Sequence, residues 1–148
     1  MVAGIHLNLF GGNMNIYNTD HFSTCPETGE DYAGKHILVD FWDVKRMGDL
    51  GFIQKTLKQG ALEAGAVILH EYYHPFGEGM GVSGVTVLAE SHISIHTWPE
   101  RDFASVDIFM CGACDPERAM RYIAEKFGAK KYDFSINKRG RHQPVVRG

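Results

Sequence analysis

The hydrophobic period changes back and forth along residues 35–137, and this alternation restricts the fold more than any other feature of the chain. β-branched, aromatic and other apolar residues form short runs, several of them alternating with polar residues, as is typical of strands. These runs are 36–44, 66–73, 83–90, 92–98, 104–110 and 131–137. Many strands with few helices between them predict an α+β fold, a two-layer sandwich with a mainly antiparallel sheet and two helices packed on one face.

Two segments have helical spacing instead, and both have recognisable ends. Apolar residues of the first recur three and four positions apart, at Leu50, Ile53, Leu57, Ala61 and Ala64. Asp49 is its predicted N-cap, and Gly65 is its predicted end. The second segment begins at Asp115-Pro116-Glu117, a capping residue followed by proline at the first helical position, and it ends at Gly128.

The two ends of the chain carry weaker patterns. Residues 5–10 favour a strand, whereas residues 11–34 are rich in Gly, Asn, Thr, Asp and Pro and predict a long loop or a poorly ordered insertion. The basic C-terminal end, from Lys138 onward, is predicted to fray. We therefore expect an N-terminal extension at 1–34, one folded domain at 35–141 and a flexible tail at 142–148.

Composition narrows the class of protein. The chain has 148 residues, 44% of them hydrophobic and 22% charged, which is typical of one soluble globular domain. A formal net charge of -3 gives no reason to expect a nucleic-acid partner, and no stretch approaches the roughly 18 apolar residues of a membrane span. Three cysteines do not make a disulfide framework, and the N-terminus has no signal-peptide pattern, so we expect a cytoplasmic protein.

Reactive residue types are densest between residues 83 and 111. Glu90 and Ser91 stand side by side, followed by His96 and later by Cys111. Side chains alternate along a strand, so Ser91 and His96 point to opposite faces and should not meet, unless Ser91 lies at a break between strands. By pattern alone, each of these polar residues is more often structural than catalytic.

Metal binding is a weaker interpretation of the same region. His92 and His96 are four residues apart, as are His70 and His74, but four residues along a strand span about 13 Å, too far for one ion. Cys111 and Cys114 form a CxxC without a second half, which is weak support for a zinc site. We therefore expect no metal.

The motif LAESHISIHTWPE, followed by VDIFMCG, resembles the processing and active-site signature of prokaryotic S-adenosylmethionine decarboxylases. The strand GKHILVDFWDV, the helix after Asp49, the loop HPFGEGMGVSGV and the DPERA helix also follow the order of that family, from about Gly34 to Arg141. The resemblance implies a proenzyme that cleaves itself between Glu90 and Ser91, giving a β chain of residues 1–90 and an α chain of residues 91–148.

The same resemblance implies how the cofactor forms. The Ser91 hydroxyl would attack the carbonyl of Glu90, a step that a strained backbone would assist. The resulting ester would then break and leave a pyruvoyl group at residue 91. This group would bind the substrate amine as a Schiff base and accept the electrons released by decarboxylation, so no other cofactor is needed.

Further site residues are carried over by the resemblance position by position. His96 corresponds to the processing histidine, since an imidazole suits proton transfer near neutral pH, and Ser83 corresponds to a second processing residue. Cys111 corresponds to the cysteine that returns a proton to the substrate carbon. Cys114 has no counterpart and is expected to be a structural thiol.

Substrate-binding residues are also implied. Phe76 resembles an aromatic residue that stacks on adenine, Glu100 a carboxylate that accepts from the ribose hydroxyls, and Trp98 would line the pocket. The alternatives are an ordinary loop aromatic for Phe76, a surface acid for Glu100 and a core residue for Trp98. Residues 78–80 and Arg101-Asp102 depart from the family pattern near this expected pocket.

The resemblance therefore implies decarboxylation of S-adenosylmethionine for spermidine synthesis, by a homodimer of cleaved protomers with active sites near the subunit interface. Stimulation by putrescine is not expected. Two alternatives stay open: a pyruvoyl-dependent arginine or ornithine decarboxylase, and an uncleaved, non-catalytic binding protein.

Overall fold

A six-stranded sheet forms one layer of the molecule, which is described here by a computed structural model covering residues 21–141. The strands are β3 (Gly34–Phe41), β4 (Ile68–Pro75), β5 (Val82–Leu88), β6 (Ser91–Trp98), β7 (Phe103–Cys111) and β8 (Tyr132–Arg139). They lie in the order β4-β5-β6-β7-β3-β8, and every neighbouring pair is antiparallel. The mainly antiparallel sheet predicted from the sequence is thus confirmed.

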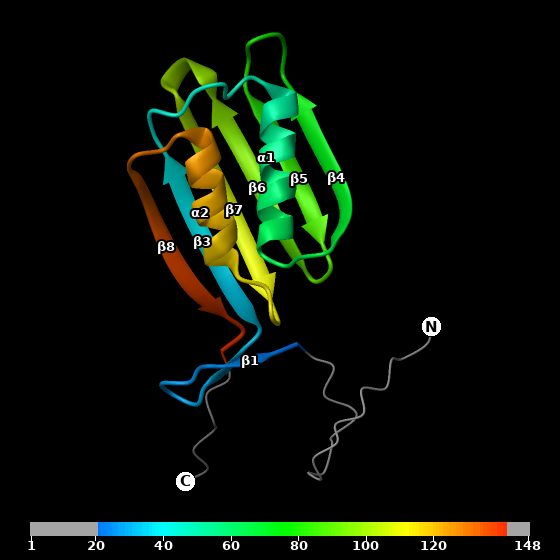
Figure 1. Ribbon diagram of the computed structural model, residues 1–148, viewed down its shortest axis with the longest axis vertical. Coiled ribbons are helices and arrows are strands. Elements are labelled where there is room, and N and C mark those ends of the chain that lie inside the picture. The colour runs from blue at the N-terminus through cyan, green and yellow to red at the C-terminus, as the bar shows by residue number, and fades with distance from the viewer. Residues whose placement is uncertain (1–20, 142–148) are drawn as a thin grey trace.

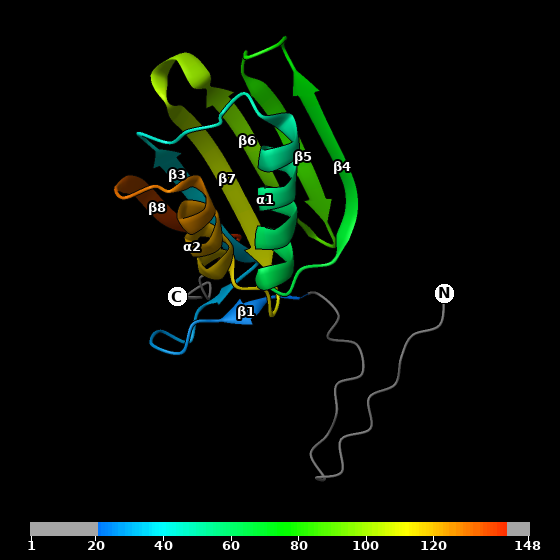
Figure 2. The same ribbon diagram turned by 45° about the horizontal axis from the view of Figure 1, so that its top comes forward.

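Two helices, α1 (Leu50–Glu63) and α2 (Pro116–Phe127), cover one face of this sheet (Figures 1 and 2). The Asp49 side chain accepts a hydrogen bond from the Phe52 amide at 2.9 Å, and the Asp115 side chain caps α2 in the same way. Gly128 ends α2 in the left-handed conformation. Both predicted helices and both predicted N-caps are therefore confirmed, as is the α+β sandwich.

Alternation along the strands separates a buried face from an uncovered one. The buried side chains of β3, β6 and β7 pack under the helices and include Ile37, Val39, Phe41, Ile93, Ile95, Val106 and Ile108. The alternate side chains point to the other face, which no other element covers within residues 21–141. This open face carries apolar groups such as Leu38, 43% exposed, and Trp98, 39% exposed.

Some strand ends differ from the prediction because pairing with a neighbour extends them. Lys138 and Arg139 were expected to belong to the fraying end, but they pair with Lys35 and Gly34 and complete β8. Strand β6 begins at Ser91 rather than at residue 92, since Ser91 pairs with Leu88 across the hairpin.

The N-terminal segment is more structured than its composition predicts. Strands β1 (Ser23–Thr24) and β2 (Asp31–Tyr32) form a short antiparallel hairpin, and the Cys25 and Tyr32 side chains are buried. The prediction of a long loop is therefore wrong for residues 23–32. The strand predicted at 5–10 and the tail predicted at 142–148 lie outside the described residues. Neither helix in the described part of the chain is long and apolar enough to span a membrane.

Candidate active site

The turn between β5 and β6 presents the bond that the sequence analysis singled out. Leu88 pairs with Ser91, so only Ala89 and Glu90 make the turn. Glu90 has a φ of 64°, in the left-handed region, which costs a residue with a side chain roughly 1–2 kcal/mol. Strain is thus present immediately before Ser91, and it lies in the φ angle of Glu90.

Cys111, at the end of β7, reaches both sides of the Glu90–Ser91 bond. Its amide donates a hydrogen bond to Ser91 Oγ at 3.2 Å, and its Sγ lies 3.6 Å from the same oxygen. The thiol also donates to the carbonyl oxygen of Glu90 at 3.0 Å. The hydroxyl that would attack and the carbonyl that would be attacked are therefore both held by one residue. We call Glu90, Ser91 and Cys111 the cleavage group.

Ser83 and His96 form a second polar contact at the other end of the same hairpin. They are direct cross-strand partners, and Ser83 Oγ lies 2.9 Å from His96 Nδ1. Both line a pocket of about 740 Å³ on the surface. A serine hydroxyl beside an imidazole can hold or move a proton in this pocket.

The three predicted substrate-binding residues line the same pocket. Phe76, 57% exposed, packs its ring edge against His74, with ring centroids 4.9 Å apart. Trp98 lies against Phe103 on the open face, so its alternative as a core residue is wrong. Glu100 follows in a short 3-10 turn, η1 (Pro99–Arg101). We call Phe76, Ser83, His96, Trp98 and Glu100 the pocket group.

One chain does not bring the cleavage group and the pocket group together. Ser91 and His96 stand five residues apart on β6, which is about 17 Å along a strand. Ser91 is buried on the helix side, whereas His96 is exposed on the open face. The prediction from alternation is therefore confirmed, and the turn before Ser91 does not change it.

The departures from the family pattern lie at different distances from the pocket. Gly79 and Met80, from the atypical loop, are among its lining residues. Asp102 is not among them and forms an ion pair with Lys45. Of the two departures, the loop is the one placed to affect what the pocket binds.

A histidine cluster on the open face is the one place in the described chain where three ligand atoms approach one another. One ring nitrogen each of His36 and His92 and one carboxylate oxygen of Asp107 lie within 4.8 Å of one another. Arg139 contacts Nδ1 of His36 at 3.1 Å, and because arginine only donates, the proton of a neutral His36 stays on Nε2. Burial and the neighbouring His36 lower the pKa of His92. The absence of a metal remains a prediction.

Cys114 lies beside the start of α2, where burial and the nearby Cys111 raise the pKa of its thiol. A raised pKa keeps the thiol protonated and unreactive, which fits the structural role expected for Cys114. It stays a prediction.

One contact to the cleavage group was not foreseen from the sequence. Nε2 of His21 lies 3.3 Å from Oε1 of Glu90. His21 belongs to the segment that was expected to be an extension apart from the site, and no motif surrounds it. Only the folded position of the hairpin reveals this contact.

Known proteins resemble this chain over the six-stranded sheet and its two helices. A model of the S-adenosylmethionine decarboxylase family matches residues 35–140. The chain belongs to this family. The S-adenosylmethionine decarboxylase proenzyme of Geobacillus sp. (strain WCH70) is 43% identical over 102 residues, which are 68% of this chain and 82% of the relative. The proenzyme of Clostridium kluyveri (strain ATCC 8527 / DSM 555 / NBRC 12016 / NCIMB 10680 / K1) is 40% identical over 116 residues, 76% of this chain and 91% of the relative.

A solved structure agrees with these sequences. The crystal structure of the adenosylmethionine decarboxylase from Aquifex aeolicus superposes with a TM-score of 0.70 at 33% sequence identity, over 79% of this chain and 98% of the other. The family identified from the motif around Glu90 and Ser91 is therefore confirmed. The family match includes both groups of site residues and leaves His21 outside.

Proposed function

We propose that this chain is a self-cleaving decarboxylase that converts S-adenosylmethionine to S-adenosylmethioninamine and CO2 for spermidine synthesis. The observation that carries the proposal is the convergence of the Ser91 hydroxyl and the Cys111 thiol on the Glu90–Ser91 bond. Membership of the family supports the substrate. We place the reaction in the cytoplasm, whose reducing conditions suit the three free thiols.

Self-cleavage begins with Ser91. Its Oγ attacks the carbonyl carbon of Glu90, the C–N bond breaks, the hydroxyl proton passes to the released amine of residue 91, and an ester forms. The Cys111 thiol, which donates to that carbonyl oxygen, stabilises the negative charge that develops there. Removal of the α-proton of residue 91 then breaks the ester by elimination and frees the carboxyl group of Glu90. Elimination leaves dehydroalanine at residue 91, and its hydrolysis by water releases ammonia and leaves the pyruvoyl group.

The residues around Ser91 suit this group. When formed, the pyruvoyl group supplies an electron sink for decarboxylation. Cys111 remains beside residue 91 and can return a proton to the substrate carbon. Phe76 and Trp98 offer aromatic surfaces to adenine and the sulfonium, and Glu100 offers acceptors to the ribose hydroxyls.

A homodimer would unite the two groups of residues. The open face carries exposed apolar residues, including Leu38, Tyr72 and Trp98, which are typical of a covered surface. A two-fold axis that lies between the copies and perpendicular to β6 would place the same face of each copy against the other, with the strands running in opposite directions. The pocket group of one copy, with His96 as the proton-transfer group, would then serve the cleavage group of the other.

Mass spectrometry and CO2 release test the proposal together. Purified protein should show two fragments, 1–90 and 91–148, and should release CO2 from S-adenosylmethionine. The Ser91→Ala variant should remain one chain, whereas the matched Ser94→Ala variant should cleave normally. An intact wild-type mass would support the uncleaved alternative. Release of CO2 from arginine or ornithine, and not from S-adenosylmethionine, would reject the proposed substrate.

A further inference from the structure

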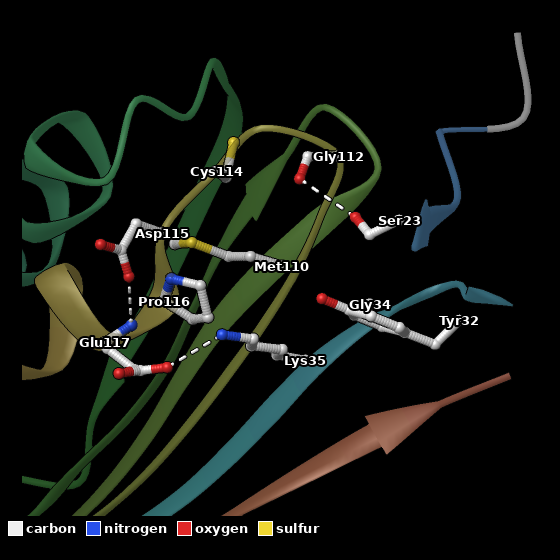
Figure 3. Close-up of a pocket in the computed structure, with 10 residues that line it drawn as sticks. All are labelled: Ser23, Tyr32, Gly34, Lys35, Met110, Gly112, Cys114, Asp115, Pro116 and Glu117. Carbon is white, nitrogen blue, oxygen red and sulfur yellow. Dashed lines mark hydrogen bonds and ion pairs between the residues drawn. The ribbon is translucent and has the colours of Figure 1, made fainter. Parts of the chain in front are cut away.

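The segment before the family match docks on the end of β7, next to Cys111. The Gly112 amide donates a hydrogen bond to the carbonyl oxygen of His21 at 3.2 Å, and Ser23 Oγ donates to the carbonyl oxygen of Gly112 at 3.5 Å. Figure 3 shows the second of these bonds and places Ser23 and Tyr32 on one side of a pocket of about 370 Å³, with the start of α2 on the other.

Strand β8 and the residues after it hold this segment in place. Lys138 Nζ lies 2.9 Å from Cys25 Sγ and 5.2 Å from the centre of the Tyr32 ring. Arg141 and Glu30 form an ion pair at 2.8 Å, and burial of Cys25 and Tyr32 adds apolar contact. The hairpin that follows His21 is therefore held by β8 and Arg141, and the Gly112 amide holds the His21 backbone itself.

The His21 side chain reaches across to the cleavage group. Its Nε2 lies 3.3 Å from Oε1 of Glu90, and Oε2 of the same carboxylate lies 4.0 Å from Cys111 Sγ. The carboxylate therefore stands between the imidazole and the thiol that contacts the scissile carbonyl. Negative charge develops on that carbonyl oxygen when Ser91 attacks, so an unbound carboxylate close to it would oppose the reaction.

We propose that His21 is a positioning residue for self-cleavage: its Nε2 contacts the Glu90 carboxylate and holds this charge and the turn in place while Ser91 attacks. The inference rests on the proposed function and deepens it. Because the family match begins at residue 35, His21 adds to groups that the family shares. We therefore expect it to change the rate of cleavage rather than to decide whether cleavage occurs.

The rate of cleavage of newly translated full-length chains tests this role. His21→Ala should slow cleavage by about two- to fivefold, the size expected for one contact between exposed ionisable groups. His21→Gln keeps an N–H donor near the place of Nε2 and should restore most of the rate. Thr24→Ala, which removes a hydrogen bond to Asp31 within the hairpin, is the matched control and should cleave like the wild type.

A second pair of variants separates this role from a merely structural one. A Glu90→Gln chain lacks the carboxylate that His21 contacts. In this chain, His21→Ala should change the rate of cleavage by less than about twofold. An undiminished effect there, or a wild-type rate in His21→Ala itself, would overturn the role of His21. Both results require that wild-type protein cleaves. Failure of the wild type to cleave would instead reject the proposed function.

Discussion

At the scale of single residues, the Glu90–Ser91 bond is set apart by what surrounds it. Ser91 and Ser94 share β6, yet only Ser91 has its hydroxyl held by the Cys111 amide and follows a left-handed residue. The adjacent pair of Glu90 and Ser91 can be found in the sequence. The left-handed φ of Glu90 could not, since it depends on a two-residue turn closed by strand pairing.

Tyr73 shows how burial changes the acid–base behaviour of a residue on the helix side of β4. Its hydroxyl lies 2.6 Å from Thr86 Oγ1, and burial raises the pKa of Tyr73 to about 12. The folded protein therefore holds this proton more tightly than the unfolded chain, whose tyrosine has a pKa of about 10. The stability that this provides is complete below pH 10 and is lost as the pH rises towards 12.

This difference predicts a measurable loss of stability in alkali. Between pH 9 and pH 11, the free energy of unfolding should fall by about 1 kcal/mol more in the wild type than in Tyr73→Phe. Urea titrations at the two pH values measure it. Equal losses in the two proteins would show that Tyr73 does not carry this pH dependence.

At the scale of elements, the pocket depends on how three segments are joined. The buried Thr97 hydroxyl, on β6, donates to the Met47 carbonyl oxygen at 2.6 Å and accepts from the Val82 amide of β5 at 2.8 Å. It therefore fixes the loop before α1 to the hairpin that carries Ser83 and His96. The sequence gives no sign of this role, because both partners lie far along the chain.

Removing the Thr97 hydroxyl should weaken this junction. Thr97→Val keeps the shape of the side chain but leaves two backbone groups without partners, and it should lower the free energy of unfolding by about 1–3 kcal/mol. Thr97→Ser retains the hydroxyl and should lose less. Denaturant unfolding of both variants measures the difference. A valine variant as stable as the serine variant would contradict the role of the hydroxyl.

The elements themselves were predictable where local signals decide them. Asp49, Asp115 and Gly128 mark helix ends by capping chemistry alone, and the structure places them there. The hairpin at residues 23–32 was not predictable. Its composition is that of a loop, and contacts with Lys138 and Arg141 hold it in place.

At the scale of the whole molecule, alternation along β6 has the largest consequence. It places Ser91 under the helices and His96 on the open face, at opposite ends of the strand. Family resemblance predicts which residues act, and the structure shows that the cleavage group and the pocket group of one chain do not meet. We therefore propose that each active site combines the cleavage group of one copy with the pocket group of another.

Co-expression of two inactive variants tests whether two copies share an active site. Neither Ser91→Ala nor His96→Ala should cleave efficiently alone. In a mixed dimer, however, Ser91 of the His96→Ala chain meets the intact His96 of the Ser91→Ala chain. Intact-mass analysis should therefore show cleavage of roughly half of the His96→Ala chains at equal expression, as random pairing of two copies gives. If the mixture cleaves no more than the His96→Ala protein alone, the two groups do not act across a dimer, which contradicts a shared active site.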